Sequence, residues 1–260
     1  MNTVLTLNHI SHSYHTDKGE TPALDDISFS VKKGIFLAIV GPSGCGKSTL
    51  LSLIAGLMIP ESGEILIHGK PLSENKGKIG YMLQRDELLE WRSIFRNVLL
   101  GPEICGTLNS ETKSYARKLL EIYGLQQFEH AKPSELSGGM RQRVALIRTL
   151  VLNPEILLLD EPFSALDYQT RLNVSDDIGQ IIRREGKTAI LVTHDLSEAI
   201  SLADTILVLS PRPASIRQVV SLSFRYPEGI SDTPLNRRNA PEFKTYFNLI
   251  WKELNEHEKN

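Results

Sequence analysis

Cysteine is scarce in this chain, long apolar runs are missing, and neither sign of charge dominates. The two cysteines, Cys45 and Cys105, lack the spacing of a metal site, and lone thiols suit a reducing compartment. No stretch stays apolar for the length of a bilayer crossing, and the first residues do not resemble a signal peptide. We therefore expect a protein that is made and kept in the cytosol.

The charges nearly cancel, since 29 Lys and Arg residues face 31 Asp and Glu residues, for a formal net charge of -2. Such a balance gives no reason to expect nucleic acid or an anionic membrane surface as the main partner. The 260 residues are 41% hydrophobic, which is enough for one sizeable core with a smaller attached lobe.

Short apolar segments rich in β-branched residues alternate with segments of helical periodicity. This alternation predicts an α/β fold, in which an open sheet of parallel strands carries helices on both faces. The expected buried strands are residues 34–40, 78–84, 155–161 and 187–195. Expected helices follow at residues 47–57, 111–124 and 138–153.

The pattern changes in the middle and at the end of the chain. Residues 85–152 are helical with few strand signals, so we interpret them as a helical lobe inserted between two parts of the sheet. Two late strands predict a hairpin around residues 211–214. Residues 225–240 are the most loop-like, and a closing amphipathic helix is expected from Pro241.

A glycine-rich motif, "GPSGCGKST", lies between an expected strand and an expected helix and fits the pattern G-x-x-x-x-G-K-S. Its glycines let backbone N–H groups converge on phosphate oxygens at a helix N-terminus, so a chance turn is disfavoured. We expect Lys47 to reach the β- and γ-phosphates of ATP, and the Ser48 hydroxyl to ligate Mg²⁺. The expected nucleotide-binding residues are Gly41, Pro42, Ser43, Gly44, Cys45, Gly46, Lys47, Ser48 and Thr49.

Two acids end the strand "ILLLDE". Alone they would be a solvated strand end, but ligands of parallel sheets bind beside the carboxyl ends of the strands. Together with the phosphate loop, Asp160 is therefore a candidate Mg²⁺ ligand. Glu161 is the candidate to orient or deprotonate the attacking water.

Three further residues are weak candidates when each is taken alone. His194 ends a strand and could reach the γ-phosphate or the attacking water, although a lone histidine is usually packed or on the surface. Gln84 ends another strand, and its amide could contact both the metal and the water. Tyr14 is a surface tyrosine on spacing alone; its functional interpretation is a ring on which adenine stacks.

A second anion-binding motif, "LSGGMRQR", lies far downstream of the first. Ser137, Gly138 and Gly139 open an expected helix, where backbone N–H groups and the helix dipole favour an anion. The residues by themselves do not say whose phosphate this loop holds.

The ordered set of Tyr14, "GPSGCGKST", Gln84, "LSGGMRQR", "ILLLDEP", "SALD" and His194 resembles the ATP-binding subunit of an ABC transporter. The resemblance runs through about Ser223. It implies a RecA-like P-loop core with a small antiparallel β portion and an inserted α-helical subdomain. In that family two cassettes dimerise head to tail, so "LSGG" is expected to hold the γ-phosphate of the partner's ATP. Asp167, in "SALD", is expected at the same interface.

The resemblance also implies the organisation and the partners. Residues 1–225 are expected to form the ATPase domain, with a helical subdomain at about 85–152, and residues 226–260 a C-terminal extension. The expected partners are a second copy, membrane permease subunits and, indirectly, a solute-binding protein, without nucleic acid. The chain would then lie peripherally on the cytoplasmic face of the membrane, with ATP and Mg²⁺ as cofactors.

A narrower resemblance, carried by "LSGGM", "DEPFSALDYQTR" and the tail at residues 237–243, is to importers of the nitrate, sulfonate and taurine group. That group tends to show "LLPW" after the glutamine, whereas this chain has "LLEW", with Glu90 where a permease would dock. The substrate stays open. Two alternatives are a non-transport ABC-type ATPase acting on nucleic acid or ribosomes, and a P-loop kinase. The first usually carries coiled-coil insertions or tandem cassettes, and "LSGG" with His194 argues against the second.

Overall fold

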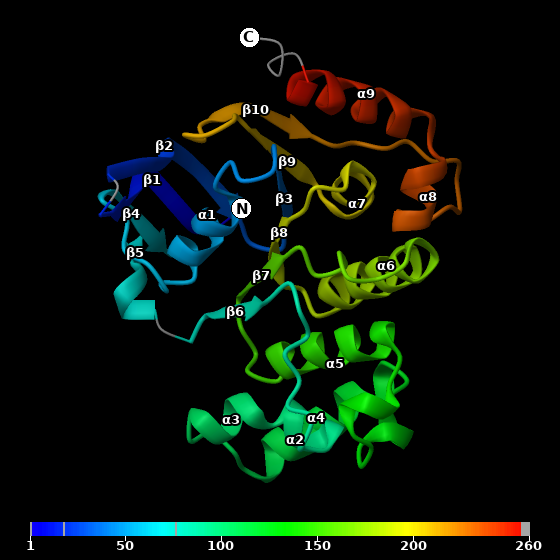
Figure 1. Cartoon of the computed structure of the whole chain (residues 1–260). Coiled ribbons are helices and arrows are strands. Elements are labelled where there is room, and N and C mark those ends of the chain that lie inside the picture. Colours follow the sequence, from blue (N-terminus) through cyan, green and yellow to red (C-terminus); the bar gives the residue numbers. More distant parts are fainter. Residues whose placement is uncertain (1, 18, 76, 256–260) are drawn as a thin grey trace. The chain divides into compact units, whose positions relative to one another are not determined.

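The computed structural model describes residues 2–17, 19–75 and 77–255. The chain divides into two compact units, one of residues 1–76 and 179–260 and one of residues 77–178 (Figure 1). We call them the first and the second unit. The division falls within α6 (Tyr168–Arg184).

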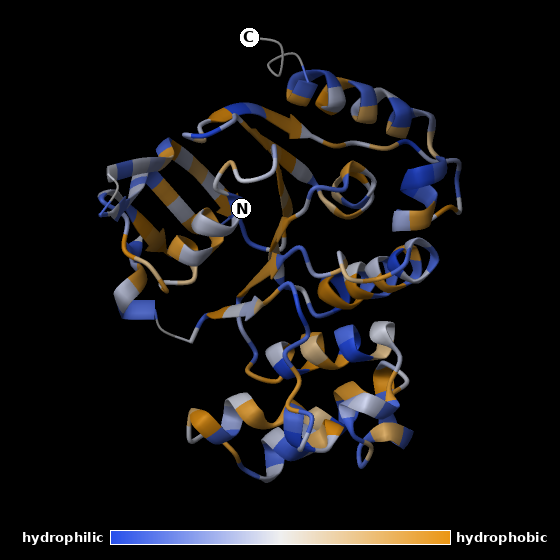
Figure 2. Ribbon diagram, viewed as in Figure 1, coloured by the Kyte–Doolittle hydropathy of each residue, from blue (hydrophilic) through white to orange (hydrophobic). Residues whose placement is uncertain are grey.

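The first unit is built on short, buried parallel strands. β3 (Phe36–Val40) lies between β8 (Thr188–Val192) and β9 (Thr205–Leu209) and is parallel to both. Every residue of β3 and β8 is buried, which explains why both strands are continuous apolar runs (Figure 2). β10 (Ile216–Ser221) is antiparallel to β9, as the expected hairpin requires.

An antiparallel sheet in the same unit has the strand order β2-β1-β4-β5. Its strands are β1 (Thr3–Thr16), β2 (Gly19–Lys32), β4 (Ser62–Ile67) and β5 (Lys70–Pro71), and the turn η1 (Leu72–Asn75) follows. β1 and β2 mix polar with apolar residues, because part of their side chains, such as Leu5 and Leu7, face the core while others are exposed.

Helices of the first unit complete its described part, together with the end of α6. They are α1 (Lys47–Ile54), α7 (Leu196–Leu202), α8 (Pro234–Asn239) and α9 (Pro241–Asn255). α7 packs against β3, α8 and α9, and α9 also contacts β9. Within the described part of the chain, none of the helices combines the length and the apolar composition that a bilayer crossing needs.

The second unit pairs two parallel strands, β6 (Ile79–Met82) and β7 (Ile156–Asp160). α5 (Gly138–Leu150) packs on β6 and contacts three other helices. These are α2 (Ile94–Val98), α3 (Leu100–Ile104) and α4 (Ser110–Ile122). Two single turns, η2 (Gln126–Phe128) and η3 (Pro133–Glu135), connect α4 to α5.

The predicted α/β class is confirmed, and so are the four expected parallel strands and the closing helix. The loop-like stretch at residues 225–240 is not all loop, because it contains α8. The residue pattern of this stretch does not indicate a helix, because α8 is held by polar contacts of Arg237. The expected limits of the ATPase domain and the C-terminal extension stay predictions.

Arg237 of α8 is the centre of those polar contacts, and its side chain is only 6% exposed. Its Nε and Nη2 each donate to Asp232 at 2.6 Å, and Nη1 donates to the carbonyl oxygen of Ala203. Nη2 also reaches Asp204 at 3.4 Å, whose other carboxylate oxygen accepts from the backbone N–H of Phe36. A buried guanidinium thus connects α8 with the start of β9 and, through Asp204, with the start of β3.

Replacing Arg237 by alanine is expected to lower the free energy of unfolding by about 2–4 kcal/mol, because it removes a buried side chain and its hydrogen bonds to Asp232 and the carbonyl oxygen of Ala203. Urea titration of the full chain measures this. Lys244→Ala, at an exposed position of α9, is the matched control and should change stability by less than about 0.5 kcal/mol.

The same contact predicts a pH dependence. The Arg237 hydrogen bonds lower the pKa of Asp232 from its usual 3.8, although burial opposes them. The stabilisation is therefore complete above that value and is lost as the pH falls through the lower folded pKa. The difference between wild type and Arg237→Ala should shrink in acid. A difference that stays constant below pH 4 would contradict this assignment.

Candidate functional site

The glycine-rich loop connects the buried strand β3 to α1 in the first unit. Gly46 immediately precedes the helix with φ 124°, a conformation that side chains disfavour. A Cβ at Gly46 would also lie 3.0 Å from the carbonyl oxygen of Ala23. The close approach of β2 therefore requires glycine at this point, where α1 begins.

Lys47 is buried and turns back into the loop. Its Nζ donates to the carbonyl oxygens of Gly41 and Pro42, each at 2.9 Å, so the ammonium lies inside the curve of the backbone. Burial raises the pKa of the Cys45 thiol, and the charge of Lys47 offsets this only in part. Cys45 is therefore a neutral, packed residue.

Tyr14 of β1 lies beside the start of α1. Its hydroxyl is 2.9 Å from the hydroxyl of Thr49, and its ring meets His12 edge-on at 5.3 Å. The side chain is 39% exposed, which leaves aromatic surface next to the loop. This position fits the adenine platform considered from the sequence.

His194 is exposed and follows β8. Because Val192 of β8 pairs with Ile39 of β3, His194 and the glycine-rich loop leave the same edge of the parallel strands. Next to it, Thr193 donates to Glu198 at 2.7 Å, and Asp195 caps α7 through the N–H groups of Ser197 and Glu198. These contacts hold the backbone on either side of the histidine.

The strand ends of the second unit bring Gln84 and Glu161 to one small network. Met82 pairs with Leu159, so both residues follow the same edge of β6 and β7. Gln84 Nε2 donates to Ser164 Oγ at 3.2 Å, and that hydroxyl donates to the carbonyl oxygen of Glu161 at 3.0 Å. Sequence reasoning missed Ser164, although it lies three residues after the acid.

Glu161 has the left-handed backbone conformation, with φ 43°. For a residue other than glycine this costs of order 1–3 kcal/mol and is typical of functional sites. The neighbouring Asp160 accepts a hydrogen bond from the Tyr81 hydroxyl of β6 at 3.1 Å. The two acids are thus held by different contacts, one through its backbone and one through its carboxylate.

The signature loop, by which we mean Ser137–Gly139, forms the N-terminus of α5. Ser137 caps the helix, with its hydroxyl accepting from the N–H of Met140 at 3.4 Å. Ser137 and Gly138 are exposed. The loop therefore exposes the N-terminus of α5, a helix of 13 residues. An anion site requires such an exposed helix N-terminus.

Close packing explains the second glycine of this loop. A Cβ at Gly139 would lie 2.7 Å from Val174 Cγ2 and 3.3 Å from Thr170 Cγ2, both on α6. Asp167 stands at the start of the same helix, where its carboxylate accepts from the N–H of Thr170 at 3.1 Å. Hydrogen bonds from the side chain and then the backbone of Thr170 lower the pKa of Asp167, so the cap is a charged carboxylate.

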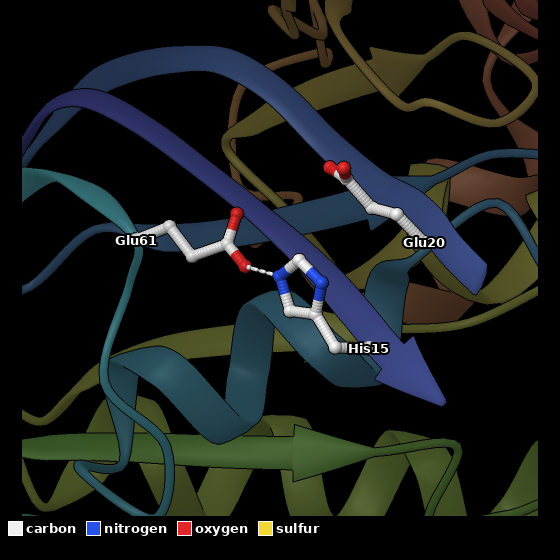
Figure 3. A group of neighbouring side chains, drawn as sticks. All are labelled: His15, Glu20 and Glu61. Atoms are coloured by element: carbon white, nitrogen blue, oxygen red, sulfur yellow. Dashed lines mark hydrogen bonds and ion pairs between the residues drawn. The ribbon is translucent and has the colours of Figure 1, made fainter. Parts of the chain in front are cut away.

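A further group of possible metal ligands, His15, Glu20 and Glu61, lies on the antiparallel sheet (Figure 3). Their ligand atoms lie within 4.8 Å of one another, and all three residues are exposed. His15 Nε2 is 2.6 Å from Glu61 Oε1, and the Ser13 hydroxyl donates to Glu20 at 2.8 Å. These protein contacts are sufficient to explain the arrangement.

The strand, loop and helix around Lys47 define a P-loop nucleotide-binding protein. Comparison with known proteins narrows the class. The family model described as "ABC transporter" matches residues 24–164. The chain belongs to the ABC transporter family and carries its ATPase domain.

Similar proteins cover almost the whole chain. The uncharacterized ABC transporter ATP-binding protein YtlC of Bacillus subtilis is 49% identical over 98% of this chain and 97% of its own length. The taurine import ATP-binding protein TauB of Roseobacter denitrificans is 37% identical over 96% and 94%. The dimeric, post-hydrolysis structure of the cassette MJ0796 bound to ADP and Pi has a TM-score of 0.71 and 30% identity, covering 84% of this chain and 99% of that one.

Gly139→Ala is expected to destabilise the chain by about 1–3 kcal/mol, because the added methyl group overlaps Val174. This loss should appear although alanine favours helices more than glycine does. Urea titration measures it. Adding Val174→Ala makes room for the methyl group, so the double variant should be more stable than the sum of the two single changes predicts. Strict additivity would contradict the packing assigned to this loop.

Proposed function

We propose that this chain is the ATP-hydrolysing subunit of an importer, which works as a homodimer beneath membrane permease subunits. The observation that carries the proposal is that two separate helices begin at glycine-rich motifs, one after Gly46 and one after Ser137, and the N-terminus of a helix favours an anion. If each ATP lies between two chains, one chain supplies the helix N-terminus after Gly46 and the other chain supplies the helix N-terminus after Ser137. The dimeric form of the similar cassette and the import role named for the Roseobacter relative support this proposal.

Each composite site then takes its parts from both chains. One chain supplies Tyr14 for the adenine and the residues from Gly41 to Thr49 for the phosphates, while the partner supplies its signature loop for the γ-phosphate. Lys47 is already held inside the loop by two carbonyl oxygens, so it needs little reorganisation to meet phosphate. Asp167 acts at the interface between the chains.

Oxygen ligands suit Mg²⁺, and the exposed Ser48 hydroxyl, the Asp160 carboxylate and the Gln84 amide are the groups proposed to hold it. When bound, Mg²⁺ neutralises charge that develops on the phosphates. Glu161 orients the attacking water or takes its proton, and His194 stabilises the γ-phosphate. Gln84 donates a hydrogen bond to Ser164 and so connects the proposed metal site to the residues that follow Gln84 in the chain.

Trp91 is the proposed contact for the permease, because its side chain is 74% exposed in the helical part of the second unit. Large aromatic side chains are enriched at protein interfaces. The chain is then peripheral on the cytoplasmic face of the membrane. We further propose that residues 1–225 form the ATPase domain and residues 226–260 an extension attached through Arg237.

Glu161→Gln is expected to reduce ATP turnover by about a hundredfold to ten-thousandfold while leaving ATP binding intact, since it removes the proton acceptor and little volume. Steady-state phosphate release and ATP titration measure the two effects. The variant should accumulate as an ATP-bound dimer. Turnover near the wild-type rate would contradict the role of Glu161.

Mixed dimers test whether the sites are composite. Lys47→Ala removes a phosphate contact, and Ser137→Arg fills the place of the γ-phosphate. When one chain carries Lys47→Ala and the other Ser137→Arg, both lesions fall in one composite site and the second site is intact. When one chain carries both changes beside a wild-type chain, each site has one lesion.

Differently tagged chains allow only mixed dimers to be purified, and the measurement is trapped ATP per dimer. One trapped ATP in the first pairing and none in the second are expected. The reverse pattern would mean that the signature loop serves the ATP of its own chain, and the proposal would fall.

A further inference from the structure

Arg141 of α5 contacts the loop that follows Gln84. Arg141, four residues after Ser137, donates from Nε to Asp86 Oδ2 at 2.9 Å and from Nη2 to Asp86 Oδ1 at 3.0 Å. The same Nη2 is 2.8 Å from Glu90 Oε1. A guanidinium bound in this forked geometry has a defined orientation as well as a counter-charge. Arg141 is therefore shared by two carboxylates of one loop.

The segment that precedes the signature loop also contacts the loop that follows Gln84. Lys132, five residues before Ser137, donates from Nζ to the carbonyl oxygen of Trp91 at 2.7 Å. Glu90 and Trp91 are adjacent in the chain. Both flanks of the signature loop are thus tied to two neighbouring residues, one through a side chain and one through a backbone carbonyl.

The two carboxylates on Arg141 differ in how firmly they are held. The Asp86 side chain is 19% exposed and also accepts from the N–H of Leu88 at 3.0 Å. Arg148 fixes the backbone there by donating to the carbonyl oxygens of Asp86 and Glu87 at 2.6 and 2.7 Å. Burial acts to raise the pKa of Asp86, but hydrogen bonds from Arg141 and Leu88 outweigh it and lower that pKa.

Glu90 is the adjustable member, because its side chain is 53% exposed and it stands next to the exposed indole of Trp91. A protein that covers Trp91 necessarily approaches Glu90. A movement of Glu90 weakens or breaks its ion pair with Arg141, whereas Asp86 stays fixed by its contacts with Leu88 and Arg148.

We propose that Glu90 is a positioning residue whose ion pair with Arg141 couples the exposed surface at Trp91 to the signature loop. A partner seated on Trp91 acts on the presentation of Ser137 through this pair. The inference rests on the proposed function, in which the signature loop contacts the ATP of a second chain.

The test uses the full chain with Glu161→Gln, so that ATP is bound and not consumed. The measured quantity is the ATP concentration at which half of the protein is dimeric, from light scattering. Adding Glu90→Gln should raise this concentration roughly two- to fivefold, the range of a partly exposed ion pair. The affinity for ADP should not change, because ADP lacks the γ-phosphate.

Glu87→Gln is the matched control. Glu87 is an exposed carboxylate of the same loop, and its replacement removes the same charge without touching Arg141. The half-dimerisation concentration should stay at the parent value. An equal rise for both variants would overturn the inference, because it would make the effect one of overall charge.

Two further measurements separate the pair from a general loss of structure. In the Arg141→Gln background, Glu90→Gln should add nothing, because its partner is gone. If Arg141→Gln fails to fold, ionic strength replaces it: at about 1 M salt the screening length is about 3 Å, so the effect of Glu90→Gln should shrink. If Glu90→Gln raises the half-dimerisation concentration just as much in either of these measurements, the proposed role of the Glu90–Arg141 ion pair is overturned.

The outcomes distinguish the two proposals. If the Glu161→Gln parent does not dimerise with ATP at all, the proposed function fails, and this inference with it. If the parent dimerises and Glu90→Gln leaves its half-dimerisation concentration unchanged, only the coupling through Glu90 fails.

Discussion

Pairing of short, buried parallel strands is the constraint on which the candidate site depends. β3 is hydrogen-bonded to a strand on each side and its five residues are apolar and buried, so the irregular backbone of the glycine-rich loop begins only where this strand ends. Ile39 pairs with Val192 in the first unit, and Met82 with Leu159 in the second. The glycine-rich loop and His194 follow the carboxyl ends of β3 and β8 in the first unit, and Gln84 and Glu161 follow those of β6 and β7 in the second. Chemistry is thereby confined to a few residues after each strand.

Helix N-termini supply the other half of the site, and packing decides which residues can form them. Gly46 is required because β2 passes close to the loop, and Gly139 because α6 passes close to α5. In both cases the glycine allows the start of a helix to lie against a neighbouring element. Two arginines make further connections: Arg141 holds Asp86 in the loop after Gln84, and Arg237 holds Asp232 before α8.

Much of this arrangement was predictable from local patterns. Continuous apolar runs indicated the parallel strands, and the motif around Lys47 indicated its loop and helix. The strands β1 and β2 were less visible, because one half of their side chains is polar and exposed. α8 escaped prediction for a similar reason: its stability depends on Arg237 meeting Asp232 and Ala203, and no periodicity reports such contacts.

The sequence by itself determined the fold class and the family, and it named the candidate phosphate-binding residues, because these inferences depend on short motifs whose spacing is local. Only the tertiary structure decided which side chains meet. Tyr14 reaches Thr49 over 35 positions, Gln84 reaches Ser164 over 80, and Arg141 holds Asp86 from 55 positions away. Such pairs form when strands and helices pack, and the free energy of that packing is a property of the whole core, which no single segment encodes.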